Sequence, residues 1–391
     1  MRALSTLLGL PQHRFASIHV VGTNGKSSVT RMIAALLEAH GVSAGACVSP
    51  HAARWSERVL VHGREVDTAE FAVAVERAAQ AAETVNRSLE EGDAVTQFEL
   101  ATAAAFVALA NARVKAAAIE AGLGGRLDAT NTIPSKVTVL TSVGLDHTEW
   151  LGESEEEIAA EKLAVLRDHS TLVLGCMSPT IEGLARQAAA EKGAELIVAP
   201  EDLGPEIQLH ALGGFQRRNF ALACAATEAF LGDLDRERAS AVAAELEIPG
   251  RLERIPGEPP AFLDAAHNPD GARALAEALP EIAAGRPVVA VLAILADKDA
   301  GAMVKALAPV LDQVICTELP DQLTRRAFGA AELARICEDI GLNAEIEADF
   351  DAAVALGRGH ALDAGGVFLV TGSHYTLAPA RAALGLNPDE H

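Results

Sequence analysis

Segments typical of β-strands and of α-helices alternate almost throughout this chain of 391 residues. The apolar run Ser17–Val21 predicts a short buried strand, and an amphipathic helix is expected from about Ser28 to His40. The same order returns at Ala261–Asp264, a predicted strand, and Pro269–Leu279, a predicted helix. Such alternation is typical of α/β proteins, because helices connect neighbouring parallel strands of one sheet. We therefore expect an α/β fold built on largely parallel sheets.

The chain is long enough for two or three domains of ordinary size. The stretch Ile248–Pro260 is dense in proline and glycine and separates two complete α/β patterns. We therefore expect residues 1–248 to form an α/β domain with a central parallel sheet of the phosphate-loop type. Residues 249–260 are interpreted as a hinge linker, and residues 261–391 as a smaller Rossmann-like α/β domain.

The composition argues against several classes of protein. The formal net charge is -22, Tyr occurs once and Trp twice, so a basic surface and aromatic platforms for nucleic acid are not expected. No run of about 18 apolar residues predicts a membrane span. The five cysteines are scattered and form no C-x-x-C pair, which is typical of a reducing compartment. We expect a cytoplasmic protein with neither a nucleic-acid partner nor a membrane partner.

The strongest local motif is VVGTNGKSS, residues 20–28. A glycine-containing turn follows the predicted strand and leads directly into a helix, so backbone N–H groups and the helix N-terminus would surround an anion. Lys26 can reach the outer phosphates of a nucleotide, and Ser27 or Ser28 can place a hydroxyl on Mg²⁺. The spacing departs from the common G-x-x-x-x-G-K-[ST] pattern, because position 20 is Val and Gly22 comes two residues later. An ordinary strand–turn–helix corner with a chance lysine is the alternative.

Three polar residues stand at or after the ends of predicted strands. Glu120 ends one strand, Ser49 follows another, and His147 lies in a loop after a third. The carboxyl ends of parallel strands meet at one edge of a sheet, so we expect all three near the phosphate loop. Oxygen ligands suit Mg²⁺ well, whereas a His nitrogen suits it less. The alternatives are a loop histidine bonded to backbone and a solvated glutamate.

The second half of the chain carries a similar polar group in LDAAHNPDG. Asp264 and His267 follow the first strand of that half and open its first helix. Asn268 also suits the N-cap of that helix, which is the alternative explanation of this group. The glycines of GLGGR do not make a dinucleotide-binding motif, because position 127 is Leu and a polar loop follows instead of a helix.

Taken together, the motifs of the chain resemble those of the folylpolyglutamate synthases, which are often bifunctional with dihydrofolate synthase, in the Mur ligase superfamily. The resemblance extends from about Leu8 to Ala383 and rests on GTNGKSS, SPH, EAGLGGRLDATN, GLDHTEWLG, EK, QRRN, PGRLE, LDAAHNPDG and TGSHY, in that order. GLGGRLDATN and LDHTEWLG are specific to the folate branch, whereas the phosphate loop is shared with the cell-wall ligases. The resemblance implies an ATP-dependent ligase that adds L-glutamate to the carboxylate of a folate, and also of dihydropteroate, through an acyl phosphate.

The resemblance also implies roles for individual residues. The nucleotide site would comprise Gly22, Thr23, Asn24, Gly25, Lys26, Ser27, Ser28, Asn219, Arg251, Asp264 and His267. Two Mg²⁺ ions would be held by Ser49, Glu120, His147 and Lys162. Lys26, His147 and Lys162 are implied to be catalytic. Lys162 matches a lysine that is carbamylated in this family, and a carbamate would turn the cation into an anion able to hold metal or its waters. A plain lysine on a helix surface is the alternative.

Three segments match those that bind the pterin substrate in the family. They comprise Leu8, Gly9, Leu10 and Pro11; Thr96, Gln97, Phe98 and Glu99; and Leu127, Asp128 and Ala129. Thr96 and Glu99 also have the spacing of a capping box, which explains them equally well. The chain departs from the family pattern at Ser27, where glycine is common, and at Leu163–Ala164, where Ala-Gly is common.

The expected mechanism combines these parts. The two domains close on ATP, Lys26 and Mg²⁺ neutralise the γ-phosphate while the substrate carboxylate attacks it, and the glutamate amine then attacks the acyl phosphate. We expect a monomer whose partners are small molecules: ATP, L-glutamate and a folate or dihydropteroate. The alternatives are a cell-wall Mur ligase acting on a UDP-linked peptide, a P-loop NTPase switch that forms no amide, and a catalytically inactive paralogue.

Overall fold

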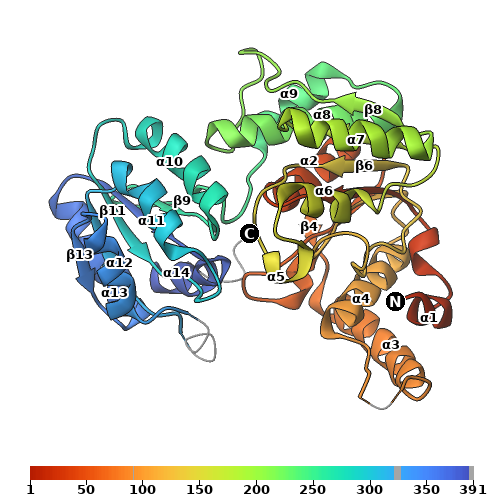
Figure 1. Ribbon diagram of the computed structural model, residues 1–391, viewed down its shortest axis with the longest axis horizontal. Coiled ribbons are helices and arrows are strands. Elements are labelled where there is room, and N and C mark those ends of the chain that lie inside the picture. Colours follow the sequence, from red (N-terminus) through yellow and green to blue (C-terminus); the bar gives the residue numbers. More distant parts are fainter. Residues whose placement is uncertain (91, 321–326, 387–391) are drawn as a thin grey trace. The chain divides into compact units, whose positions relative to one another are not determined.

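The computed structural model describes residues 1–90, 92–320 and 327–386. The chain divides into two compact units. The first unit comprises Met1–Leu209 and Arg217–Leu246, and the second comprises His210–Gln216 and Glu247–His391. Each unit has a central sheet covered by helices, so the predicted α/β class is confirmed (Figure 1). Among the described helices, none is long and apolar enough to cross a membrane.

An eight-stranded sheet runs through the first unit in the order β4-β3-β2-β5-β1-β6-β7-β8. From β2 to β8 all neighbouring strands pair in parallel, whereas β3 pairs antiparallel with both β2 and β4. The strands span Ala16–Val21 (β1), Ala44–Cys47 (β2), Val59–Val61 (β3), Arg64–Glu65 (β4), Ala116–Glu120 (β5), Val137–Leu140 (β6), Thr171–Leu174 (β7) and Glu195–Val198 (β8). Because β2, β5, β1 and β6 are adjacent and parallel, the loops that follow them emerge at one edge of the sheet.

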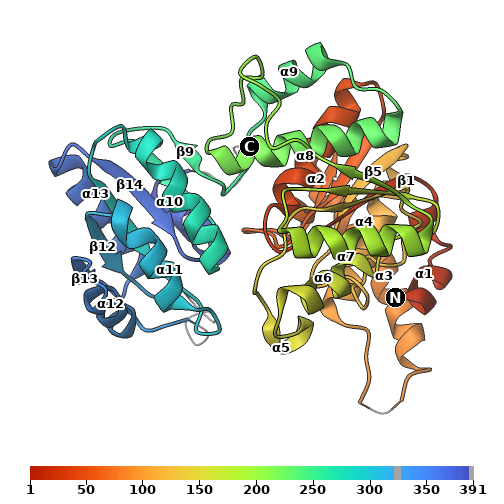
Figure 2. The ribbon, with the colours of Figure 1, turned by 45° about the horizontal axis from the view of Figure 1, so that its top comes forward.

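Helices cover both faces of this sheet (Figure 2). Ile119 of β5 and Leu140 of β6 belong to the face on which α3, α4, α6 and α7 bury their apolar side chains. Ala46 of β2 lies on the opposite face and packs with Ala34 of α2. The helices of the first unit span Arg2–Leu7 (α1), Lys26–Ala39 (α2), Thr68–Asn86 (α3), Gln97–Asn111 (α4), Thr148–Leu151 (α5), Glu155–Leu163 (α6), Pro179–Lys192 (α7) and Arg236–Glu245 (α9). The helix α8 spans Gly214–Leu231, and its residues from Arg217 onward belong to this unit.

The second unit contains a six-stranded sheet in the order β13-β12-β11-β14-β10-β9. Only β9 is antiparallel to its neighbour among these described strands. The strands span Glu253–Ile255 (β9), Ala261–Leu263 (β10), Val288–Leu292 (β11), Gln313–Cys316 (β12), Ala344–Ile346 (β13) and Val367–Thr371 (β14). The helices span Pro269–Ala283 (α10), Ala300–Leu307 (α11), Ala330–Asp339 (α12), Phe350–Asp363 (α13) and Leu377–Ala383 (α14).

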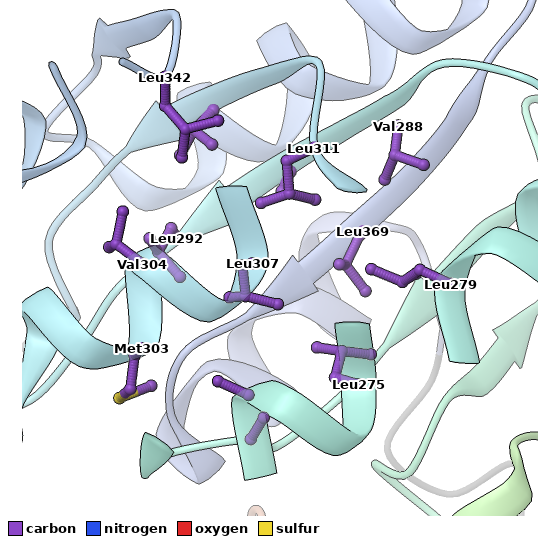
Figure 3. Packing of buried hydrophobic residues seen from close by; sticks show 14 of the residues in the cluster. Leu275, Leu279, Val288, Leu292, Met303, Val304, Leu307, Leu311, Leu342 and Leu369 are labelled. Carbon is purple, nitrogen blue, oxygen red and sulfur yellow. The ribbon is translucent and has the colours of Figure 1, made fainter. Parts of the chain in front are cut away.

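Successive side chains of β14 point to opposite faces of the sheet in the second unit, and each face is covered by helices. Leu369 belongs to the core that β11 and β12 share with α10, α11 and α12, and Figure 3 shows it beside Leu279. Phe368, the preceding residue, faces α13 instead. A Cβ added at Gly357 of α13 would lie 2.9 Å from the Phe368 ring, so glycine is needed for this close approach. The unit is a doubly wound sheet with helices on both faces, as the sequence pattern predicts.

The boundary between the units differs from the predicted one in two respects. Residues 210–216 belong to the second unit, because Leu212 and Phe215 pack against its core. The segment 249–260, interpreted as a linker, contains β9, whose Ile255 pairs with Ala261 of β10. Its prolines and glycines therefore surround an edge strand instead of forming a free connection. The helix α11 ends at Leu307, and Ala308–Val310, with Pro309 at its centre, continue as a 3-10 helix.

Candidate functional site

The phosphate loop, residues 22–28, connects β1 to α2, and two of its glycines are required by geometry. Gly22 has a φ of +155°, and a Cβ there would lie 1.9 Å from Oγ1 of Thr141. Gly25 is the N-cap of α2 with a φ of +83°, and a Cβ there would lie 2.7 Å from Oδ1 of Asn219 on α8. The loop thus passes closely between the end of β6 and α8, which also places Asn219 beside it.

Residues after β6 fix the loop through hydrogen bonds. The backbone N–H of Thr23 donates to the Ser142 carbonyl at 2.9 Å, and the N–H of Asn24 donates to Oγ of Ser142 at 2.8 Å. Oγ1 of Thr141 donates to the Asn24 carbonyl at 2.6 Å. Gly144 donates its N–H to Oγ1 of Thr23 at 3.1 Å. The loop is therefore preorganised, which lowers the entropic cost of holding a phosphate.

Lys26 opens α2 and bends back over the loop. Its Nζ donates to the Thr23 carbonyl at 3.0 Å. An ammonium group has three donors, so Lys26 can keep this bond and still contact an anion. The 14-residue helix α2 contributes the positive end of its dipole at the same place. The turn, Lys26 and the start of α2 thus lie together as the anion cradle requires, and phosphate binding there stays a prediction.

Ser49 and Glu120 are brought together with the phosphate loop, as predicted. Oγ of Ser27 donates to Oε1 of Glu120 at 2.9 Å, and the N–H of Ser49 donates to Oε2 at 2.8 Å. Oγ of Ser27 also lies 3.3 Å from the Ser49 carbonyl. Glu120 is 2% exposed, which contradicts the interpretation as a solvated charge. Hydroxyl and carboxylate oxygens in one group are ligands that suit Mg²⁺.

His147 has an unusual backbone for a non-glycine residue, with a φ of +52° at the N-cap of α5. Its Nε2 lies 3.8 Å from Oδ1 of Asp146. Within residues 1–90, 92–320 and 327–386, no three His, Cys, Asp or Glu side chains are arranged to hold a metal. The role of His147 as a metal ligand stays a prediction.

Lys162 is buried, and the interpretation as a plain surface lysine is wrong. Its side chain, on α6, is 2% exposed, and its Nζ donates to the Gly22 carbonyl at 2.9 Å. Burial, followed by the nearby positive charge of Lys26, lowers the pKa of Lys162 from 10.5 to about 7. Lys162 follows Ile158 by four residues and Ala159 by three, so all three side chains lie on the same, buried face of α6.

The glycine loop, residues 121–131, follows Glu120 at the end of β5 and packs close to Lys162. A Cβ at Gly125 would lie 2.6 Å from the Glu161 carbonyl and 2.9 Å from that of Lys162, so this loop packs directly on α6. Leu127 at its tip is 92% exposed. Asp128 is largely buried, and this burial raises its pKa even though several hydrogen bonds to the carboxylate oppose the shift.

The predicted substrate-binding segment that contains Phe98 packs against the start of the glycine loop. A Cβ at Gly122 would lie 2.2 Å from the ring of Phe98, so Phe98 packs against the glycine loop. The capping box is also present: the N–H of Glu99 donates to Oγ1 of Thr96, and Thr96 returns its N–H to the Glu99 carboxylate. The structure thus supports the capping explanation for these two side chains.

The segment Leu8–Pro11 lies between α1 and a 3-10 turn. Leu8 is buried, and its carbonyl accepts from the Arg77 guanidinium of α3 at 3.1 Å. Leu10 has a φ of +53° and is partly exposed. The structure fixes this segment against α3, and its role in substrate binding stays a prediction.

In the second unit, Asp264 organises the backbone around it. Its two oxygens accept from the N–H groups of Leu252 at 2.9 Å and Ala266 at 2.8 Å. Burial raises the pKa of Asp264, while the positive charge of Arg251 opposes that shift. Nδ1 of His267 contacts the Ala265 carbonyl at 2.9 Å. The N-cap role of Asn268 is confirmed, because its Oδ1 accepts from the Gly271 N–H at 2.8 Å.

Sequence reasoning missed the residues that support these groups. Thr141 and Ser142 hold the phosphate loop, and their signal is a pair of hydroxyl residues directly after a buried strand. Arg167 donates to the carbonyls of Asn131 and Ile133 at the end of the glycine loop. A lone arginine after a helix carries no distinctive signal in the sequence.

Comparisons with known proteins agree with this arrangement. Residues 20–198 match the Mur ligase middle domain, and residues 250–374 match the Mur ligase, glutamate ligase domain. The chain is 34% identical to the dihydrofolate synthase/folylpolyglutamate synthase of Mycobacterium tuberculosis, over 99% of this chain and 89% of that protein.

Two solved structures are similar over nearly the whole chain. The Mycobacterium tuberculosis folylpolyglutamate synthase complexed with ADP has a TM-score of 0.91 and 33% identity, covering 99% of this chain and 94% of the other. The bifunctional folylpolyglutamate synthase/dihydrofolate synthase of Yersinia pestis, complexed with AMPPNP and a Mn ion, has a TM-score of 0.85 and 29% identity, covering 98% and 92%.

Proposed function

This chain belongs to the family of folylpolyglutamate synthases and dihydrofolate synthases among the Mur ligases, and we propose that its phosphate loop and the adjoining Ser27–Ser49–Glu120 group carry its reaction. The chain is an ATP-dependent ligase that joins an amino acid to a carboxylate and releases ADP. The observation that carries the proposal is the convergence of Ser27, Ser49 and Glu120 beside a loop from which Lys26 projects.

In the proposed reaction, an oxygen of the acceptor carboxylate attacks the γ-phosphorus of ATP. The bond between that phosphorus and the bridging oxygen breaks, and ADP leaves. The free amine of L-glutamate then attacks the acyl carbon, the carbon–oxygen bond to phosphate breaks, and the amine loses its extra proton. The products are an amide, ADP and phosphate. Lys26 and the loop N–H groups stabilise the charge that develops on the phosphoryl oxygens.

Ser27, Ser49 and Glu120 would hold Mg²⁺, with His147 as a further predicted ligand. The bound ion would neutralise phosphate charge, which Lys26 alone does only in part. The donor chemistry fits, because the hydroxyl of Ser27, the carbonyl of Ser49 and the carboxylate of Glu120 are oxygen ligands gathered at one place.

Lys162 is proposed to carry a carbamate. Carbamate formation requires a neutral amine, and burial already lowers the pKa of Lys162 to about 7. The positive charge of Lys26, which disfavours an ammonium at this position, would instead favour the anionic carbamate. The negative group would stand beside the carbonyl of Gly22, within the phosphate loop.

Asn219, Arg251, Asp264 and His267 are proposed to complete the nucleotide site. Asn219 is supported by its place beside Gly25, and Asp264 and His267 by the well-organised turn that they share. We propose dihydropteroate and a reduced folate as acceptors. A monomeric state and a cytoplasmic location stay predictions. The five cysteines form no disulfide, which fits a reducing compartment.

The decisive experiment incubates the protein with Mg-ATP, L-glutamate and either dihydropteroate or tetrahydrofolate, and measures the mass of the product. The expected product is the acceptor plus one glutamate, with one ADP for each amide. Lys26→Ala should lower kcat by at least about 100-fold, because it removes charge stabilisation at the transferred phosphoryl group. The matched control, Lys192→Ala on the exposed end of α7, should retain activity. ADP formation without any amide would contradict the proposal.

A further inference from the structure

His19 is a polar residue in the middle of an apolar strand. It is fully buried in β1, between Ile119 of β5 and Thr138 of β6 in the register of the sheet. A histidine at such a position must be hydrogen-bonded to offset the cost of its burial. Burial lowers the pKa of His19 to about 3, so the ring is neutral and carries one proton.

A hydrogen-bonded chain leads from His19 to the glycine loop. Nε2 of His19 lies 2.8 Å from Oγ1 of Thr130, and Oγ1 of Thr130 donates to Oδ1 of Asp128 at 2.5 Å. Because the Thr130 hydroxyl donates its one hydrogen to the Asp128 carboxylate, the oxygen of Thr130 accepts the hydrogen bond from the ring. Nε2 of His19 therefore carries the ring proton, and Nδ1 has no hydrogen-bond partner among the described residues.

These hydrogen bonds fix the carboxylate of Asp128 in one orientation. Oδ1 of Asp128 also accepts the Thr130 N–H at 2.9 Å, and Oδ2 accepts the Leu123 N–H at 2.8 Å. Asp128 thereby ties the start of the glycine loop to its end. The exposed Leu127 lies next to this anchor, so the part of the loop that faces solvent depends on it.

We propose that His19 is a positioning residue for the acceptor substrate, acting through Thr130 to hold Asp128 and the glycine loop in the conformation that binds the acceptor. This inference rests on the proposed function. The buried polar group in β1 is the ring of His19, and the same strand leads into Gly22 three residues later. One strand would then position both the phosphate loop and the glycine loop.

The test compares variants at His19 by steady-state kinetics and ADP binding. His19→Leu removes the Nε2 donor but fills the space, and it should raise the KM for the acceptor by about tenfold or more. ADP affinity should be unchanged, because the phosphate loop keeps its own hydrogen bonds to Thr141 and Ser142. His19→Gln, whose amide N–H can replace the Nε2 donor, should restore the KM.

Ser17→Ala is the matched control for burial. Ser17 is a fully buried residue of β1, two positions before His19, and its Oγ has no hydrogen-bond partner among the described residues. This variant should keep the KM of the unmodified protein. An equal rise in KM for Ser17→Ala and His19→Leu would overturn the proposal, because the effect would then belong to the strand and not to the hydrogen bond.

A double-mutant cycle with Thr130 isolates the coupling. Thr130→Val should raise the acceptor KM as His19→Leu does, and the double variant should be no worse than Thr130→Val alone. An unchanged KM in His19→Leu, or a parallel loss of ADP affinity, overturns the inference while the proposed function stands. If the unmodified protein forms no amide with either acceptor, the proposed function fails, and the inference fails with it.

Discussion

Gly25 shows how strongly a single residue constrains the phosphate loop. Its φ of +83° is strained for any residue with a Cβ, and the space is already occupied by the amide of Asn219. The sequence alone singled out this glycine as part of a cradle. It could not indicate that the obstacle to a side chain comes from α8, nearly 200 residues later.

Gly25→Ala should weaken ADP binding by about tenfold or more, because the loop must move to relieve both the strained φ and the contact with Asn219. Isothermal titration calorimetry measures this directly. Gly183→Ala is the control: this α7 glycine has nothing within 4 Å of an added Cβ. It should bind ADP normally and gain about 0.5–1 kcal/mol of stability from better helix propensity. Equal ADP affinity in both variants would count against the close contact at Gly25.

Lys162 provides the prediction on pH. With a pKa of about 7, its amine is mostly neutral at pH 8 and mostly protonated at pH 6. Since only the neutral amine captures CO₂, a carbamate signal in ¹³C NMR with labelled bicarbonate should be strong at pH 8 and should decline as the pH falls below about 7. Lys192→Gln, a change at an exposed lysine, should keep the signal, and Lys162→Gln should abolish it. A signal that persists in Lys162→Gln would assign the carbamate elsewhere.

At the scale of the element, cap residues and periodicity predicted the helices well. The capping box at Thr96 and the N-cap at Asn268 start α4 and α10 where the sequence indicates. The sequence prediction did not include α13, because Gly357 and Gly359 weaken its helical pattern. The packing of Gly357 against Phe368 compensates, and this tertiary contact has no local signal. The strand β9 was missed for a related reason, since its turn-forming neighbours resemble a linker.

Thr96→Ala should lower the free energy of unfolding by about 1 kcal/mol, because it removes the acceptor for the Glu99 N–H at the start of α4. Chemical denaturation measures the change. Thr84→Ala on α3 is the control: the Thr84 hydroxyl is exposed and bonds only to the Gln80 carbonyl in its own helix, so alanine should be neutral or slightly stabilising. If the two variants unfold alike, the capping box contributes nothing measurable.

The site itself was predicted in part. Residues at or after strand ends, such as Glu120 and Ser49, were placed correctly because parallel topology alone brings strand ends together. Lys162 was not recognised as buried from the local sequence, although its position four residues after Ile158 follows the apolar stripe of α6. The links His19–Thr130 and Ser27–Glu120 join residues about 100 positions apart, and only the folded chain brings such pairs together.

At the scale of the whole molecule, the large apolar clusters formed by the described residues each lie within one unit. One core comprises buried side chains of α10, α11 and α12 with β11 and β14, all in the second unit. Others, around Phe106 and around Leu140, lie in the first unit. Because each unit has its own apolar core, the chain is expected to unfold in more than one step.

Leu369→Ala and Leu140→Ala test this expectation as a matched pair. Both leucines are fully buried in central strands, Leu369 in β14 of the second unit and Leu140 in β6 of the first. Each truncation should destabilise its own unit by about 2–5 kcal/mol through lost burial and an incompletely closed cavity. Differential scanning calorimetry should therefore resolve two transitions, with a different one lowered in each variant. A single transition, shifted equally by both changes, would mean that the units unfold together and that their cores are coupled in stability.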